Sequence, residues 1–173
     1  IHSVMYQSPQ ALVIADSTFL ENRATGGNGG AIYHQDGALT FTGSLVAGNR
    51  AFTQGGGLWL YHPTSASVTN VTFTANRAEG AAAPSGYAIG GGLSIYPSGP
   101  NVTLCHLTVA RNHAGWTGGG VTVAAPAWNV TLRKLMPHAR PPLARLVLVG
   151  SRGSQEPPWA CAALEVNRIL TVM

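Results

Sequence analysis

Apolar residues recur along residues 11–132 as short pairs, and the two members of a pair are separated by one residue. That spacing is the period of a β-strand with one face turned toward a core. The same three pairs occur in four successive copies, with Ser, Ala or His at a few of the positions. The first pairs are Leu12/Ile14, Leu39/Phe41, Ala66/Val68 and Val102/Leu104; the second are Ser17/Phe19, Ser44/Val46, Val71/Phe73 and Leu107/Val109; the third are Ile32/His34, Leu58/Leu60, Leu93/Ile95 and Val121/Val123. Each copy is therefore predicted to contain three short strands, with a corner where the alternation slips between the first pair and the second.

An asparagine follows the second pair of every copy. Asn22, Asn49, Asn76 and Asn112 are separated by 27, 27 and 36 residues, and each precedes a Gly-rich tract. A repeat of this length cannot bury its apolar face alone, so the copies must stack with equivalent strands about 4.8 Å apart. The sequence predicts an all-β fold, a parallel β-helix (solenoid) of about four coils with three short strands per coil. A sandwich of hairpins is the alternative, but only Asp36-Gly37 offers the tight turn that it needs.

The repeated asparagines and glycines are expected to be structural. An Asn side chain carries both a donor and an acceptor, so stacked copies can bond to one another and to turn backbone. Glycine permits a positive φ and lets one coil approach the next closely. The tract at residues 26–30 superficially resembles a phosphate-binding loop, but neither a helix pattern nor a Lys-Ser/Thr pair follows it. We therefore expect no nucleotide and no other cofactor.

Short motifs in these repeats are similar to those of a known family. Phe19-Leu20-Glu21-Asn22 and Phe73-Thr74-Ala75-Asn76 have the form FxxN, and Gly29-Gly30-Ala31-Ile32 reads GGAI. Over about residues 11–132 the chain resembles the repeats of chlamydial polymorphic outer membrane proteins. The resemblance implies a right-handed parallel β-helix of the pectin-lyase-like superfamily, and it implies the surface-exposed adhesin passenger that this family builds from such repeats.

Composition changes at about residue 132. Residues 133–173 contain six basic and two acidic residues and five prolines, so the net charge of +4 lies in this tail. A fifth coil begins with Val130 and Leu132, but Pro137 then occupies a position due to face inward. We predict a β-helix repeat domain at 1–132 and a linker or irregular cap at 133–173, with a strand near 143–149 and a short helix near 160–172. The basic residues are too widely spaced to indicate nucleic-acid binding.

Three Asn-x-Thr triplets begin at Asn70, Asn101 and Asn129. They are candidates for glycosylation, which suggests an exported eukaryotic chain, although corner asparagines followed by strand threonines also create such triplets by chance. The chain contains neither a signal segment nor a run of 18 apolar residues. We expect an extracellular or cell-surface location, no membrane span in this chain, and a mature chain or a fragment of a longer protein. Cys105 and Cys161 cannot form a disulfide framework, and Cys105 is expected to be a core thiol.

Enzymes are the main rival, since the pectin-lyase-like superfamily includes polysaccharide lyases, hydrolases and epimerases. A hydrolase needs two carboxylates about 5–10 Å apart, and a lyase needs acidic calcium ligands together with a base. Asp16, Glu21 and Asp36 fall at different coil positions and do not recur in neighbouring coils. The histidines are scattered in the same way, so no metal site is expected. The sequence therefore favours a protein that is not an enzyme.

An aromatic stripe is the first candidate for a binding surface. Tyr33 and Trp59 lie between inward residues of the third strand, and Tyr61 and Tyr96 occupy the next outward positions. Flat aromatic faces suit sugar rings as well as aromatic or Arg groups of a protein. A covering neighbour, or the preference of strands for aromatic residues, is the alternative explanation.

A basic stripe is the second candidate. Arg23, Arg50 and Arg77 each follow a repeated asparagine, and His113 takes that place in the fourth copy. Stacked like charges need a partner, which can be an anionic glycan or a local acid, Glu21 or Glu79.

The sequence thus predicts a non-catalytic secreted or cell-surface β-helix module for adhesion, with a glycan or a cell-surface protein as its partner. A polysaccharide-modifying enzyme and a purely structural stalk are the alternatives.

Overall fold

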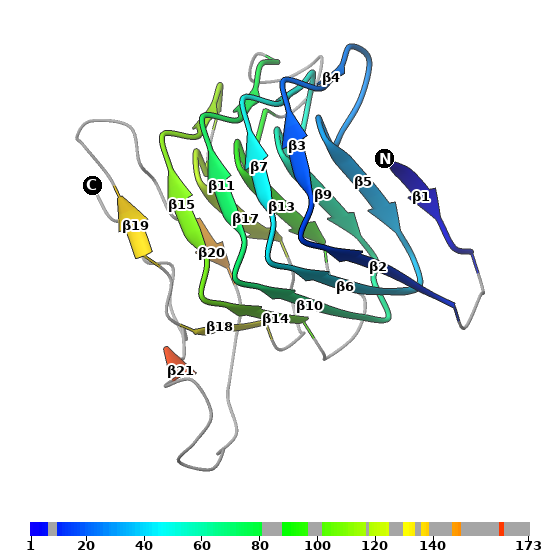
Figure 1. The fold of residues 1–173 in the computed structure, drawn as a ribbon. Helices are drawn as coiled ribbons and strands as arrows, with labels where there is room; N and C mark the ends of the chain where they lie inside the picture. Colours follow the sequence, from blue (N-terminus) through cyan, green and yellow to red (C-terminus); the bar gives the residue numbers. More distant parts are fainter. Residues whose placement is uncertain are drawn as a thin grey trace.

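The computed structural model of the chain describes residues 1–6, 10–80, 88–96, 102–116 and 118–124, together with four short strands between residues 130 and 164. Every regular element among these residues is a β-strand (Figure 1). The chain winds through successive coils, and each strand lies beside its equivalent in the next coil. The predicted all-β fold, a parallel β-helix, is confirmed.

The strands form four sheets, named A to D here. Sheet A contains β1 (His2–Val4), β5 (Ile32–Gln35), β9 (Leu58–Tyr61), β13 (Leu93–Tyr96), β17 (Val121–Ala124) and β20 (Val147–Val149). Sheet B contains β2 (Ala11–Ala15), β6 (Ala38–Thr42), β10 (Ser65–Thr69), β14 (Val102–Cys105), β18 (Val130–Arg133) and β21 (Ala163–Leu164). Sheet C contains β3 (Thr18–Leu20), β7 (Leu45–Ala47), β11 (Thr72–Thr74), β15 (Thr108–Ala110) and β19 (Met136–His138). Sheet D contains β4 (Arg23–Ala24), β8 (Arg50–Ala51), β12 (Arg77–Ala78) and β16 (His113–Ala114).

Sheet D corrects the prediction of three strands per coil. The first, second and third predicted strands are the strands of sheets B, C and A, whereas the stretch assigned to a turn after each Asn forms a fourth, two-residue strand. Its register pairs Arg50 with both Arg23 and Arg77. Two residues are too few to show an alternation of apolar and polar positions, so the pattern could not reveal this strand.

The corners between sheets B and C and between sheets C and D are made by single residues with a positive φ. Between sheets B and C the corner residues of successive coils are Asp16, Gly43, Asn70 and His106, with φ of 45°, 59°, 55° and 52°. Between sheets C and D they are Glu21, Gly48, Ala75 and Arg111, with φ of 53°, 68°, 55° and 56°. One left-handed residue turns the chain and shifts the inward parity by one, which explains the slip in the sequence pattern.

The core is the column of side chains that all coils turn inward. It contains the predicted apolar pairs, among them Ile32, Leu58 and Leu93 of sheet A, each 0% exposed. The ring of Phe41 meets the rings of Phe19 and Phe73 edge to face, at centroid distances of 6.1 and 6.3 Å. Such edge-to-face contacts add to the burial of apolar area that holds the stack together.

The predicted Asn ladder is present inside the corner before sheet D. The Oδ1 atom of Asn49 accepts bonds from the backbone N and the Nδ2 of Asn22, both at 2.9 Å. Asn76 receives the equivalent bonds from Asn49 at 3.0 and 2.9 Å, and Asn112 receives them from Asn76 at 2.9 Å. Asn49 and Asn76 are 0% exposed, so each link satisfies polar groups that water cannot reach.

A fifth coil continues the stack beyond residue 124. Strands β18, β19 and β20 pair in parallel with their equivalents of the fourth coil in sheets B, C and A, and β19 places Pro137 opposite Val109. Strand β20 lies within the range predicted as a strand. Strand β21 falls where a short helix was predicted, and it pairs antiparallel with β18 at the edge of sheet B. The division of the chain at residue 132 stays a prediction.

Candidate ligand-binding face of sheet A

The outward side chains of sheet A form two rows across the coils. Alternation along each strand turns Ile32, Leu58 and Leu93 into the core and their neighbours outward. The pairing register places His2, Tyr33, Trp59, Ser94 and Thr122 in the first row, and Val4, Gln35, Tyr61 and Tyr96 in the second. The structure thus brings together all four residues of the predicted aromatic stripe.

The rings of these residues contact one another across strands β5, β9 and β13. Trp59 is at the centre, with ring centroids 4.6 Å from Tyr33, 4.8 Å from Tyr61 and 6.4 Å from Tyr96. Tyr61 stacks on Trp59 at an interplanar angle of 15°, and its ring lies 6.1 Å from that of Tyr96. We call Tyr33, Trp59, Tyr61 and Tyr96 the aromatic cluster.

Trp59 differs from the expectation that it would project as an exposed stacking surface. It points away from the core, as predicted, but it is only 7% exposed. Its Nε1 donates a hydrogen bond to Oε1 of Gln54 at 3.1 Å, and the three tyrosines surround its ring. Trp59 therefore supports the cluster from beneath, whereas the partly exposed Tyr33, Tyr61 and Tyr96 present it to solvent.

Two histidines extend the cluster beyond the predicted residues. His62 follows Tyr61 at the corner after β9 and stacks on its ring at 3.8 Å and 18°. His2 of β1 lies 4.4 Å from the ring of Tyr33. Both are exposed. The alternation pattern missed His62 because a corner residue follows no strand period, and it missed His2 because β1 precedes the first recognisable copy.

A line of polar groups borders the cluster on the side of Asp36. The hydroxyl of Tyr33 donates to Oε1 of Gln35 at 2.5 Å, and Nε2 of Gln35 donates to Oδ2 of Asp36 at 3.3 Å. Burial raises the pKa of Tyr33, and the nearby Tyr61 and Asp36 raise it further. Burial also raises the pKa of Tyr96, although a hydrogen bond with Gln54 opposes this shift. These hydroxyls are therefore protonated donors at neutral pH.

The aromatic character ends where the first row passes Trp59. Ser94 and Thr122 take the next two positions, and both are buried although they point away from the core. Within the described part of the chain, their hydroxyl oxygens have no hydrogen-bond partner. The turn before β13 packs closely here, since a Cβ on Gly90 would lie 2.6 Å from that of Ser94. The accessible part of the face is therefore formed by Tyr33, Tyr61 and Tyr96 and not by Ser94 or Thr122.

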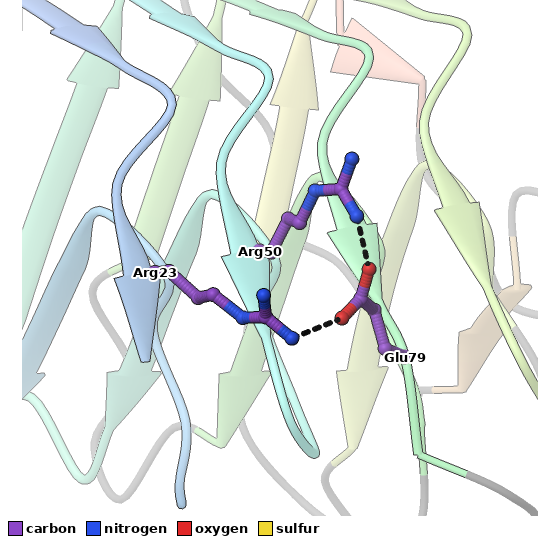
Figure 2. A network of polar contacts seen from close by, with 3 residues as sticks. All are labelled: Arg23, Arg50 and Glu79. Atoms are coloured by element: carbon purple, nitrogen blue, oxygen red, sulfur yellow. Dashed lines mark hydrogen bonds and ion pairs between the residues drawn. The ribbon is translucent and has the colours of Figure 1, made fainter. Parts of the chain in front are cut away.

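The predicted basic stripe forms a column on sheet D. Arg23, Arg50 and Arg77 lie in register, and His113 continues the column. Figure 2 shows the carboxylate of Glu79 reaching both Arg50, at 2.8 Å, and Arg23, at 3.6 Å. Of the two local acids considered from the sequence, Glu79 is the one that pairs. The side chains of Arg23 and Arg50 remain 62% and 50% exposed, so solvent screens both pairs.

Arg77 lies beside this group without sharing its counter-charge. Within the described residues, it is exposed and takes part in no ion pair. Glu79 therefore balances two of the three stacked arginines and leaves Arg77 without an ion pair among the described residues. The column can attract an anion through Arg77, but it presents no enclosed geometry that would select one.

The remaining candidates are dispersed over the fold. Asn70 is exposed at the corner between β10 and β11, while Asn101 and Asn129 lie outside the described residues. Asp16, Glu21 and Asp36 occupy three different corners, and the described residues contain no group of three metal-ligating side chains. Cys105 is buried, its Sγ lies 3.3 Å from Nδ1 of His106, and it pairs in register with Thr69. None of the described residues forms a helix that is long and apolar enough to cross a membrane.

One of the repeated segments that build this face matches a known protein repeat. The segment from the Asp16 corner through β3, β4 and β5 carries the first Asn, the first Arg and Tyr33. Residues 16–35 match the Chlamydia polymorphic membrane protein (Chlamydia_PMP) repeat. This match confirms the resemblance at residues 16–35, and the pairing register shows that the copies after this segment have the same coil plan. No curated protein and no solved structure matches the chain.

Proposed function

We propose that the chain is a non-catalytic binding module of a cell-surface protein, and that it recognises its ligand through the aromatic cluster on sheet A. The observation that carries the proposal is the group of three partly exposed tyrosines held over the buried Trp59. Large rigid rings lose little conformational entropy on binding and supply both an apolar face and a hydroxyl. The polymorphic membrane protein repeat at residues 16–35 supports a location at a cell surface.

Several features support a binding role over catalysis. Asp16, Glu21 and Asp36 occupy separate corners, and Glu79 is engaged with two arginines. General acid–base chemistry on a polysaccharide needs two carboxylates facing one substrate. A polysaccharide-modifying enzyme remains the alternative that the test below must address, and a structural stalk is the second alternative.

The test is retention of the 173-residue chain on immobilised polysaccharides and glycoproteins, with a parallel assay for new reducing or unsaturated ends. We expect retention without product, and we expect the double variant Tyr61→Ala/Tyr96→Ala to lose it. Tyr6→Ala is the matched control, because Tyr6 is 73% exposed and has no ring contact within the described residues. Product formation would establish an enzyme, and absence of any retention would favour a stalk.

A further inference from the structure

Building on the proposed function, we propose that the ligand class of the aromatic cluster is a neutral saccharide. The chemistry of the face suits a sugar ring with uncharged hydroxyls better than an acidic glycan. Three properties carry this assignment: the spread of the rings, the polar line along one edge, and the sign of the local charge.

The rings form a broad surface rather than an enclosing cage. Tyr33, Tyr61 and Tyr96 come from three consecutive coils, whose strands are about 4.8 Å apart. Tyr61 is nearly parallel to the buried Trp59, His62 stacks on the ring of Tyr61 at 3.8 Å, and Tyr96 is tilted by 57° from Tyr61. A surface of this kind receives the flat C–H face of a sugar, since aromatic faces are apolar and carry partial negative charge.

The edge of the surface offers hydrogen bonds of both kinds. The Tyr33 hydroxyl, the Gln35 amide and the Asp36 carboxylate form one continuous chain of hydrogen bonds. On the other side, the Gln54 amide bonds to Trp59 and holds its ring in place. Sugar hydroxyls donate and accept, and a carboxylate has several acceptor sites left after one bond, so Asp36 can take a hydroxyl pair.

The local charge opposes acidic ligands. Among the side chains of β5, β9 and β13 and of the described corner residues after them, only Asp36 is formally charged at neutral pH. The arginines of the basic stripe, Arg23, Arg50 and Arg77, are on sheet D and not on sheet A. A uronic acid or sulfated sugar on the cluster would meet the Asp36 carboxylate, and no Lys or Arg of these described strands and corners balances it. Binding to a neutral sugar should, in contrast, depend little on salt.

The test is native affinity electrophoresis of the 173-residue chain in gels that contain a neutral polysaccharide (a β-glucan, a galactomannan or a xyloglucan) or an acidic one (polygalacturonate or heparin). We expect retardation by at least one neutral polymer, unchanged between about 0.05 and 0.5 M salt. The affinity should fall at least about tenfold in Tyr61→Ala/Tyr96→Ala and stay within about twofold in Tyr6→Ala.

A conservative variant tests the role of the edge. Asp36 adopts a φ of 57°, which asparagine tolerates well, so Asp36→Asn keeps the corner. It should weaken neutral binding by about three- to tenfold, because hydrogen bonds to a charged acceptor are the stronger ones.

The outcomes separate this proposal from the proposed function. Salt-sensitive retardation by acidic polymers alone would overturn the neutral-sugar assignment. Tyrosine-dependent binding to enzymatically deglycosylated glycoproteins, without binding to any neutral polymer, would also overturn it and leave the binding module intact. If no polymer and no glycoprotein showed binding that depends on Tyr61 and Tyr96, both the neutral-saccharide assignment and the binding module would be overturned.

Discussion

The aromatic rows of sheet A and the arginine column of sheet D are built by the same coil register, but different forces hold them. Rings repeated at coil spacing attract one another, so Tyr33, Trp59 and Tyr61 form a cohesive cluster. Arginines repeated at that spacing repel, and Glu79 offsets the repulsion for only two of them. Repetition therefore produces an ordered surface only where the repeated group complements itself.

The Asn ladder shows the same rule inside the coil. Each asparagine lies one residue before a member of the Arg column, yet its amide carries both a donor and an acceptor and bonds to the next copy. The interior column needs no outside partner, whereas the column beside it does.

Asn76→Ala should destabilise the fold by about 3–5 kcal/mol, because it removes four hydrogen bonds and leaves buried groups unpaired. Chemical denaturation gives the free energy of unfolding. Asn22→Ala is the control, since Asn22 is exposed and its side chain makes one bond, to Asn49. Equal losses in the two variants would show that burial of the ladder does not matter.

Trp59→Ala should cost about 3 kcal/mol, because a nearly buried ring with three aromatic neighbours leaves a cavity. In contrast, Arg77→Ala in the arginine column of sheet D should change the free energy of unfolding by less than about 0.5 kcal/mol. The comparison uses the same denaturation experiment on both variants. A larger loss for the arginine variant would reverse our view of which column is cohesive.

The buried His34, on the inner side of sheet A, should make the fold less stable in acid. His34 is 0% exposed and its Nε2 has no partner within the described residues, and burial lowers its pKa below the ordinary 6.5. His34 binds a proton more readily in the unfolded chain than in the folded chain, so above pH 6.5 its protonation takes nothing from the free energy of unfolding. That free energy falls as the pH drops from there toward the folded-state pKa, by at most about 1.4 kcal/mol per pH unit.

Thermal unfolding of the wild type and of His34→Leu between about pH 7.5 and 5 measures this term. Leucine is the matched replacement, since Leu60 occupies the paired position of the next coil. The variant should show a shallower slope than the wild type. An unchanged slope would mean that His34 does not titrate with unfolding.

Glu79→Gln should have the smallest effect, a loss of about 0.5–1 kcal/mol at low salt, because the pairs with Arg23 and Arg50 are exposed. Raising the salt concentration to about 0.5 M should reduce the difference from the wild type, since the charges are then screened. Melting temperatures at the two salt concentrations provide the readout. A salt-independent loss would assign Glu79 a packing role instead.

Much of the fold could be predicted because each coil repeats the same physical requirements. The pairs Leu39/Phe41 and Val71/Phe73 show the strand period directly, and the Asn spacing of 27 residues indicates stacking. Sheet D escaped prediction because its strands have two residues. The slip in alternation predicted a corner between the first pair and the second, but it did not predict the left-handed conformation there, because Asp16, Gly43, Asn70 and His106 share no side-chain chemistry.

The candidate site was predicted in part. Alternation correctly turned Tyr33, Trp59, Tyr61 and Tyr96 outward, but it carries no information on how far a ring is covered by its neighbours. The burial of Trp59 therefore emerged only from the packing of rings from adjacent coils. Glu79 was one of two local acids predicted as a partner of the arginine column, and the choice of Glu79 over Glu21 also emerged from packing across coils to Arg23 and Arg50.

A binding experiment can compare the aromatic cluster of sheet A directly with the arginine column of sheet D. The retention of Tyr61→Ala/Tyr96→Ala and of Arg50→Ala/Arg77→Ala would be measured on the same immobilised ligand surface as the wild type. We expect the tyrosine variant to lose at least about tenfold in affinity and the arginine variant to stay within about twofold of the wild type. Loss in the arginine variant, with the tyrosine variant unchanged, would contradict this expectation and move the ligand site to sheet D.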